Sequence, residues 1–278
     1  MLDSSGQSLE NFTFASDTRN YARGKQRHFV DAFRTVCWFH HLRLAVGATA
    51  TYQMDLLLEP PPAQGLKRLD DRKNKWRGYR LGRHTPSSAL VSEIEARHPG
   101  GQQLLNLPLW QIMRLDVPIE SSVELLGKMA PEVYASVFHS ASVLGGRGIR
   151  TPERGDIQCR HLERLASMDS LAGLILLMRL AGKAENSFLA YRFGRTATRV
   201  LSILGSWLWD HGIAQPMADY FGNHLLTSVN TGIYSLTFDP TRFLRHVVFL
   251  EKEAARIAAD ENGKLTHQQR ITAFRKLM

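Results

Sequence analysis

Apolar residues recur about every three or four positions along most of this 278-residue chain, which is the spacing that places them on one face of an α-helix. The first such run covers residues 26–46 without Gly or Pro, and it predicts a helix that ends at Gly47. Its apolar positions are Phe29, Phe33, Val36, Cys37 and Leu44. A shorter helix is predicted over residues 50–59. The run Pro60-Pro61-Pro62 ends it, because proline has no backbone N–H and clashes with the preceding turn.

The next two helices are predicted mainly by their ends. Asp70 or Asp71 is a suitable N-cap for a third helix over 72–81, and Gly82 then occupies the position after its C-cap. Thr85-Pro86 predicts the start of a fourth helix, with Thr as N-cap and Pro as the first helical residue. This helix carries Leu90, Val91 and Ile94 on one face and ends at His98-Pro99-Gly100.

The rest of the chain is predicted to be helical as well. Long apolar-periodic runs cover 156–182, 187–210 and 240–259. Residues 231–238 alternate instead and predict a strand, and the glycines within 145–148 predict a loop. Further helix starts are expected at Pro131, Thr151-Pro152, Pro216, Asp239-Pro240 and Thr266. The fold class predicted from this pattern is mainly α.

The positive charge of the chain is concentrated in one segment. Residues 66–83 contain eight Lys and Arg residues and two Asp, in a chain whose net charge is +9. The eight are Lys67, Arg68, Arg72, Lys73, Lys75, Arg77, Arg80 and Arg83. A basic segment of this kind is typical of a surface that meets phosphate groups or acidic protein.

The predicted helix over 72–81 separates aromatic from charged residues. Trp76 and Tyr79 are three positions apart and can share the face that packs on the first and fourth helices. Cations and one amide are left for the outer face, where Arg or Lys can read guanine, Asn can pair with adenine, and other cations hold phosphates. The candidate DNA-binding residues are therefore Arg72, Lys73, Asn74, Lys75, Arg77, Arg80 and Arg83.

The spacing around this helix resembles that of the Cro/C1-type (lambda-repressor-like) helix-turn-helix family. In that family the recognition helix ends in an aromatic residue followed three positions later by Gly, and a Pro four positions further opens the next helix. Tyr79, Gly82 and Pro86 fit this interval, and Gly47-Ala48-Thr49 resembles the family's first turn. The resemblance covers residues 25–100. It implies a DNA-binding module that acts as a dimer on half-sites one helical turn apart.

Together these features divide the chain into three expected parts. Residues 1–24 form a flexible N-terminal tail, residues 25–105 a helix-turn-helix-like basic module, and residues 106–278 an α-helical domain for oligomerisation or a partner. Apolar helices near 171–182 and 187–210 favour self-association through the last part. The function predicted first is DNA binding, as a transcriptional regulator.

Other functions remain open at this point. The basic helix also fits a helical adaptor or effector that meets an acidic protein partner, an anionic membrane surface, or simply solvent. A third alternative is an RNase-like toxin that uses Arg34 and His40, because an Arg several residues before a His on a helix is a loose signature of HEPN-type ribonucleases. The sequence contains no phosphate-binding loop, nucleophile elbow or metal-ligand spacing, so no catalytic residue, metal or cofactor is expected.

The cellular location is predicted from what the chain lacks. Its longest apolar run, Leu171–Leu177, falls far short of the roughly 20 residues that cross a bilayer. The N-terminus has no signal-peptide pattern, and Cys37 and Cys159 form no disulfide framework. We therefore expect a cytoplasmic protein without membrane contact.

Overall fold

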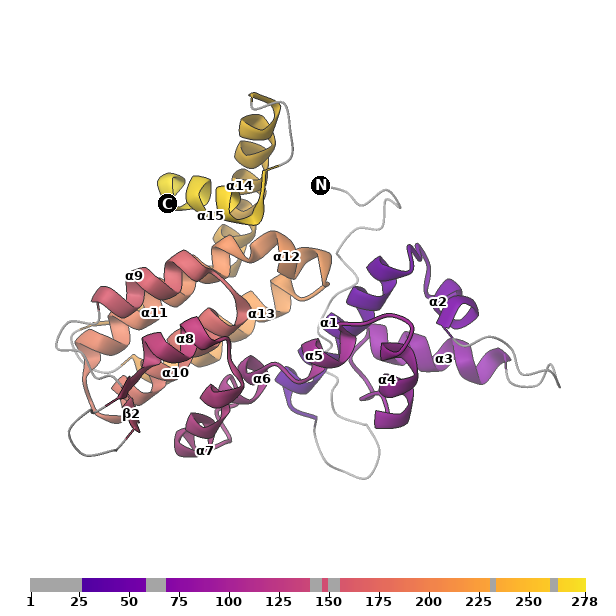
Figure 1. Cartoon of the computed structure of the whole chain (residues 1–278), viewed down its shortest axis with the longest axis horizontal. Coiled ribbons are helices and arrows are strands. Elements are labelled where there is room, and N and C mark those ends of the chain that lie inside the picture. Colours follow the sequence, from indigo (N-terminus) through magenta and orange to yellow (C-terminus); the bar gives the residue numbers. More distant parts are fainter. Residues whose placement is uncertain (1–26, 59–68, 141–146, 150–155, 231–233, 261–264) are drawn as a thin grey trace. The chain divides into compact units, whose positions relative to one another are not determined.

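The computed structural model is mainly helical, as predicted (Figure 1). It describes residues 27–58, 69–140, 147–149, 156–230, 234–260 and 265–278. The expected tail 1–24, the Pro60–Pro62 segment and the Thr151-Pro152 start lie outside these residues. The Cα positions divide the chain into two compact units. Unit 1 comprises residues up to Asn106 together with Leu208–Pro216, and unit 2 comprises Leu107–Trp207 and Met217–Met278.

Unit 1 is built from five helices within the described residues before 107. They are α1 (Phe29–Ala45), α2 (Thr51–Leu58), α3 (Leu69–Arg80), α4 (Ser88–Glu95) and α5 (Gly101–Leu105). The segment Leu208–Pro216 joins them, although it lies inside the range expected for the second part of the chain. α1 is the centre of the unit, since both α3 and α5 pack against it.

Two helix starts in unit 1 differ from the prediction. α3 begins at Leu69, so Asp70 and Asp71 lie in its first turn, where negative charge is also favourable, and neither is the N-cap. α4 begins at Ser88, and its N-cap is Ser87, whose side chain accepts a hydrogen bond from the Leu90 N–H at 3.3 Å. Thr85 is not the cap because its hydroxyl accepts a hydrogen bond from Arg27 instead.

The remaining elements lie in unit 2, except that the end of α12 and the start of α13 fall within Leu208–Pro216 of unit 1. The helices are α6 (Pro108–Ile112), α7 (Ile119–Val123), η3 (Glu124–Lys128), α8 (Pro131–Val137), α9 (Asp156–Leu165), α10 (Met168–Lys183), α11 (Ser187–Ile203), α12 (Gly205–Asp210), α13 (Ala214–Tyr220), η4 (Phe221–Leu226), η5 (Thr227–Val229), α14 (Pro240–Asp260) and α15 (His267–Leu277). The starts at Pro131, Pro240 and Thr266 are confirmed, Thr266 being the N-cap of α15. The start near Pro216 is two residues early, at Ala214.

The core of unit 2 surrounds α10. Every residue from Leu171 to Met178 is buried, and α6, α8, α9 and α11 pack around this helix. The apolar run that favoured self-association is therefore used inside the unit. Arg179, on the same helix, donates to the carbonyls of Ile112, Arg114 and Val117 at 2.6–3.0 Å, and it thereby holds the chain that follows α6.

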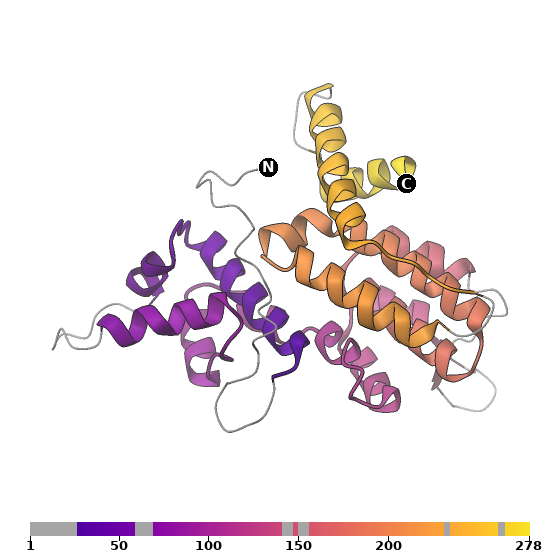
Figure 2. The same cartoon turned by 180° about the vertical axis from the view of Figure 1, so that it is seen from behind.

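The predicted strand over 231–238 is wrong within the described residues, because Tyr234–Phe238 is extended but has no partner strand (Figure 2). Its alternation nevertheless reflects partial contact with helices, since Leu236 and Phe238 are half-buried while Ser235 and Thr237 are exposed. Tyr234 contacts the ring of Tyr191 at 5.6 Å between centroids, and Phe238 contacts that of Phe221 at 5.7 Å. The side chain of Asn230 replaces a sheet partner, since it both accepts from the N–H and donates to the carbonyl of Leu236.

Two short strands were not predicted, and the second of them overlaps the end of the expected loop 145–148. β1 (Phe138–Ser140) pairs antiparallel with β2 (Arg147–Ile149), with His139 opposite Gly148. Arg147 and Gly148 of the predicted loop therefore lie in β2, and Gly145 and Gly146 lie outside the described residues. Three-residue strands carry too little apolar alternation to be recognised in a sequence.

Candidate nucleic-acid interface

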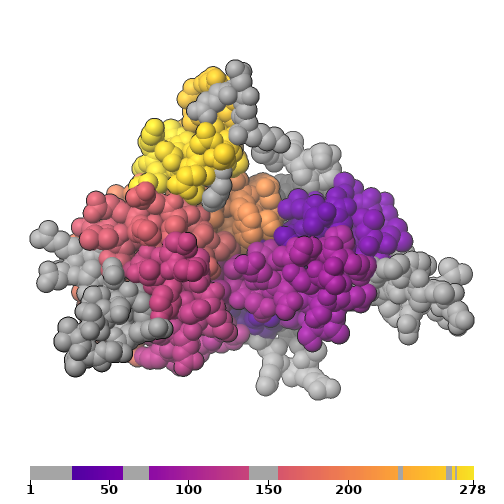
Figure 3. All heavy atoms as spheres, viewed as in Figure 1, coloured from indigo at the N-terminus to yellow at the C-terminus, as the bar shows by residue number. Residues whose placement is uncertain are grey.

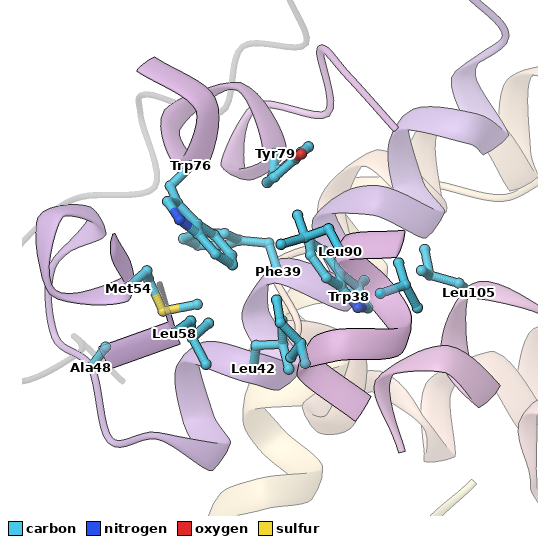
Figure 4. Packing of buried hydrophobic residues seen from close by; sticks show 12 residues of the cluster. Trp38, Phe39, Leu42, Ala48, Met54, Leu58, Trp76, Tyr79, Leu90 and Leu105 are labelled. Atoms are coloured by element: carbon cyan, nitrogen blue, oxygen red, sulfur yellow. The ribbon is translucent and has the colours of Figure 1, made fainter. Parts of the chain in front are cut away.

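One face of α3 is fixed by aromatic packing on α1 (Figure 4). Trp76 is completely buried and Tyr79 is 5% exposed. The Trp76 ring stacks on Trp38 of α1 with 5.9 Å between centroids and 8° between planes, and Tyr79 meets Trp38 edge-on at 5.4 Å. Such pairs add roughly 0.5–1.5 kcal/mol each beyond the burial of their area. The prediction that Trp76 and Tyr79 anchor the helix is confirmed.

Among the described charged side chains of α3, that of Arg77 is the one exposed to solvent. It forms no hydrogen bond or ion pair to the residues that the structure describes. Arg80, one turn later, and Lys75 are half-buried, while Arg83 beyond the helix end is exposed. The expected exposure of Lys75 is therefore only partial. Arg72, Lys73 and Asn74 lie on α3, but their side chains are outside the described residues.

The C-terminal end of α3 is closed by a Schellman motif. The Arg83 N–H donates to the Gly78 carbonyl at 2.8 Å, and the Gly82 N–H donates to the Tyr79 carbonyl at 3.0 Å. Gly82 has φ +64°, the left-handed conformation that glycine adopts without steric cost. The predicted position of Gly82 after the helix is confirmed, and it fixes the direction in which Arg83 leaves α3.

Arg27 ties this turn to the start of α1. Its guanidinium donates to the Gly82 carbonyl, to the Asp31 carbonyl at 2.7 Å and to the Thr85 hydroxyl at 2.9 Å. Burial lowers the pKa of Arg27, but the group stays charged because an arginine pKa begins far above neutrality. Arg27 was not among the candidate residues, since its partners lie 55 and 58 positions away in the chain.

Next to α3, α1 adds further positive charge. Arg43 donates from its Nε to the Nδ1 of His40 at 3.2 Å. Burial, followed by the nearby charges of Arg43, His211 and Arg80, lowers the pKa of His40 to about 3. His40 is therefore neutral at pH 7 and adds no charge beside Arg43 and Arg80. Arg43 is not predictable from the sequence, because no local signal joins α1 to α3.

The geometry gives no support to a ribonuclease built on Arg34 and His40. Both residues lie within the uninterrupted helix α1, and six positions on a helix place two side chains about 120° apart around its axis. A His with a pKa of about 3 is also a poor proton acceptor at neutral pH. The pair therefore does not converge on a site where a phosphate could react.

The described residues also offer no metal centre or reactive thiol. No group of three or more His, Cys, Asp or Glu among them is placed to hold a metal ion. Cys37 is fully buried in α1, and burial raises the pKa of its thiol, which makes it unreactive. His41 stacks on His211 at 6.1 Å between centroids, which is packing rather than ligation.

Comparison with known proteins assigns this chain to no family. No family model, curated protein or solved structure matches this chain. Among the helices that the structure describes, none has both the length and the apolar character needed to span a bilayer.

Proposed function

We propose that unit 1 binds DNA and that α3 is its recognition helix. The observation that supports this most strongly is the division of α3 between two environments. Trp76 and Tyr79 lock one face to α1, and the Arg77 side chain is exposed and forms no ion pair with any described residue. A rigid helix that presents cations to solvent is the form that enters a DNA major groove.

Each candidate residue has a distinct chemical role in this proposal. Arg77 and Arg80, one turn apart, can bind guanine edges or straddle phosphates, and Lys75 and Arg83 at the flanks hold phosphates. Arg72, Lys73 and Asn74 extend the same helix toward its N-terminus, where Asn74 would pair with adenine. Arg43 on α1 adds a phosphate contact beside Arg80.

The wider role that we propose is that of a cytoplasmic transcriptional regulator that acts as a dimer. Cro-like modules pair in this way because one module buries little surface on its own. The cytoplasmic location is supported by Cys37 and Cys159, which are both buried free thiols.

A second candidate function is an adaptor that binds an acidic protein. One observation favours it: α2, which packs against α3, exposes more than half of the surface of Tyr52, Leu56 and Leu57. Apolar residues beside cations are common in protein interfaces and have no place against a DNA backbone.

Binding of a labelled duplex, followed by fluorescence anisotropy at about 50 mM salt, tests the proposal. Arg77→Ala should weaken binding by about 1–3 kcal/mol if Arg77 reads a base edge. The matched control is Arg97→Ala, because Arg97 is an exposed arginine of unit 1 that already pairs with Glu93. Equal affinities of the two variants, or no binding by a folded protein, would reject the DNA proposal and favour the acidic partner.

A further inference from the structure

Unit 2 contains a pocket that the proposed function does not use. Its volume is about 500 Å³, and it lies between α11, the residues around the start of α14, and the end of α15. In Figure 3 the yellow atoms of α15 lie next to those of α9, and Arg275 of α15 forms an ion pair with Glu163 of α9. Met278, which lines the pocket, packs against the buried cluster that contains Ile203 of α11 and Ile271 and Phe274 of α15, so this wall adjoins the folded core.

The pocket carries unbalanced positive charge. Arg199 and Arg242 both line it. The carboxylate of Glu163 pairs with Arg199 at 3.1 Å and also with Arg275 at 3.4 Å, so one negative charge serves two guanidinium groups. Arg242 is exposed and forms no ion pair or hydrogen bond through its side chain to the residues that the structure describes.

The acidic residue in the lining is already engaged. Asp239 accepts hydrogen bonds through Oδ1 from the backbone N–H groups of Thr241 at 2.8 Å and Arg242 at 3.2 Å. It therefore caps the N-terminus of α14 and neutralises part of that helix dipole rather than an arginine. An anion that enters the pocket does not have to displace an existing Arg242–carboxylate pair.

Arg199 has one hydrogen-bond donor, its buried Nε, that no described residue satisfies, while another nitrogen of the same guanidinium holds Glu163. The Arg199 side chain is nevertheless 36% exposed, so its charge is accessible from the pocket that it lines. His246 is a further lining residue, and burial together with Arg242 lowers its pKa, which leaves it neutral and able to donate without adding charge.

The pocket lining also includes apolar residues. Phe243 is 4% exposed, and its ring lies 5.6 Å from that of Phe238 between centroids. Leu277 of α15 lines the same pocket and is 38% exposed. The lining thus combines cations with aromatic and aliphatic carbon.

We propose that this pocket binds a small organic anion whose carboxylate meets Arg242 and Arg199 and whose apolar body packs on Phe238 and Phe243. The volume is in the range of about 300–1,000 Å³ that is typical of small-molecule sites. Ligands of this class are aromatic or medium-chain carboxylic acids, and the site is separate from the basic face of α3.

Calorimetric titration of the full chain with 1-naphthoate, and with its neutral isostere 1-naphthalenemethanol, tests this proposal. The acid should bind with saturable 1:1 stoichiometry and about tenfold more tightly than the alcohol, because a charged hydrogen bond contributes about 1.5 kcal/mol or more. Arg242→Gln should weaken binding of the acid by a similar factor and leave binding of the alcohol unchanged. The matched control is Arg245→Gln, an exposed arginine of the same helix that does not line the pocket, and it should bind as the wild type does.

A variant that fills the pocket gives an independent readout. Thr237 lines the pocket from an exposed position, so Thr237→Trp should block the acid and the alcohol alike without disturbing the core. Absence of saturable naphthoate binding by the wild type, equal affinity for acid and alcohol, or equal effects of Arg242→Gln and Arg245→Gln would each overturn the proposal. None of these results depends on whether unit 1 binds DNA.

Discussion

A Cβ atom added to Gly82 would lie 2.8 Å from the Cβ of Ala32, so the turn after α3 meets α1 at a contact that only glycine permits. The same residue has φ +64°. Gly82 is therefore required for two independent reasons: its left-handed backbone conformation and the lack of space for a side chain beside Ala32. Gly47, at the end of α1, has nearly the same φ of +66° but no atom within 4 Å of its added Cβ.

Gly47 and Gly82 together distinguish the energetic cost of a left-handed backbone from the cost of a steric clash. Gly47→Ala should lower the free energy of unfolding by about 1–2 kcal/mol, because a left-handed alanine is strained. Gly82→Ala should cost about 1–3 kcal/mol more, because the methyl group also has to displace Ala32. Urea denaturation followed by circular dichroism measures both. Equal losses would show that the Gly82–Ala32 contact relaxes freely.

A non-glycine residue occupies the corresponding position after α10. Glu185 has φ +55°, and its N–H donates to the Gly182 carbonyl while the Asn186 N–H donates to the Ala181 carbonyl, the same motif that closes α3. Glu185→Gly should stabilise unit 2 by about 1 kcal/mol, which corresponds to a rise in Tm of about 2–4 °C. Ala184→Gly is the control, since Ala184 has φ −82° and gains nothing from glycine. Calorimetry that finds the two variants alike would contradict the strain at Glu185.

The pKa of His40 predicts how unit 1 responds to acid. Because the folded-state pKa is about 3 and the unfolded-state value about 6.5, the unfolded chain binds the proton first. Stability contributed by neutral His40 is complete above pH 6.5 and falls as the pH drops toward 3, by at most about 1.4 kcal/mol per pH unit. His40→Gln should flatten this dependence between pH 6.5 and 4. A pH profile identical to that of the wild type would show that His40 is protonated without cost.

The regulator proposal predicts a dimer that forms through residues beyond 110. Sedimentation velocity at micromolar concentration should then show a species of twice the chain mass. The burial of Leu171–Met178 within unit 2 removes the apolar run that first favoured self-association, so the contact has to use other surfaces. A strictly monomeric protein would weaken the regulator proposal and leave the adaptor alternative unaffected.

Local signals in the sequence predicted much of the fold. Gly47, Gly82 and Thr266 act through their own turn of backbone, so their positions at helix ends follow from a few neighbouring residues. The aromatic face of α3 was predictable for the same reason, because a spacing of three positions defines one side of a helix.

The missed features depend on distant partners. Thr85 is of a residue type that commonly caps a helix, but its hydroxyl accepts a hydrogen bond from Arg27, and Ser87 is the N-cap instead. The alternation of residues 234–238 describes a segment half-buried at Leu236 and Phe238, and nothing in it tells whether a strand or a set of helices covers that side. The proximity of Arg43 on α1 to Arg80 on α3, and the pocket at Arg199 and Arg242, likewise depend on how separate helices come together.

The salt dependence of DNA binding tests the central claim most directly. If Lys75, Arg77, Arg80 and Arg83 each neutralise a phosphate, log K should fall against log salt with a slope of about −3.6, a loss of over a hundredfold between about 50 and 200 mM. Arg77→Ala should reduce the slope by about one if Arg77 holds a phosphate. Anisotropy titrations of a mixed-sequence duplex give both slopes. A slope near zero, or one that Arg77→Ala and Arg97→Ala change equally, would contradict binding through α3.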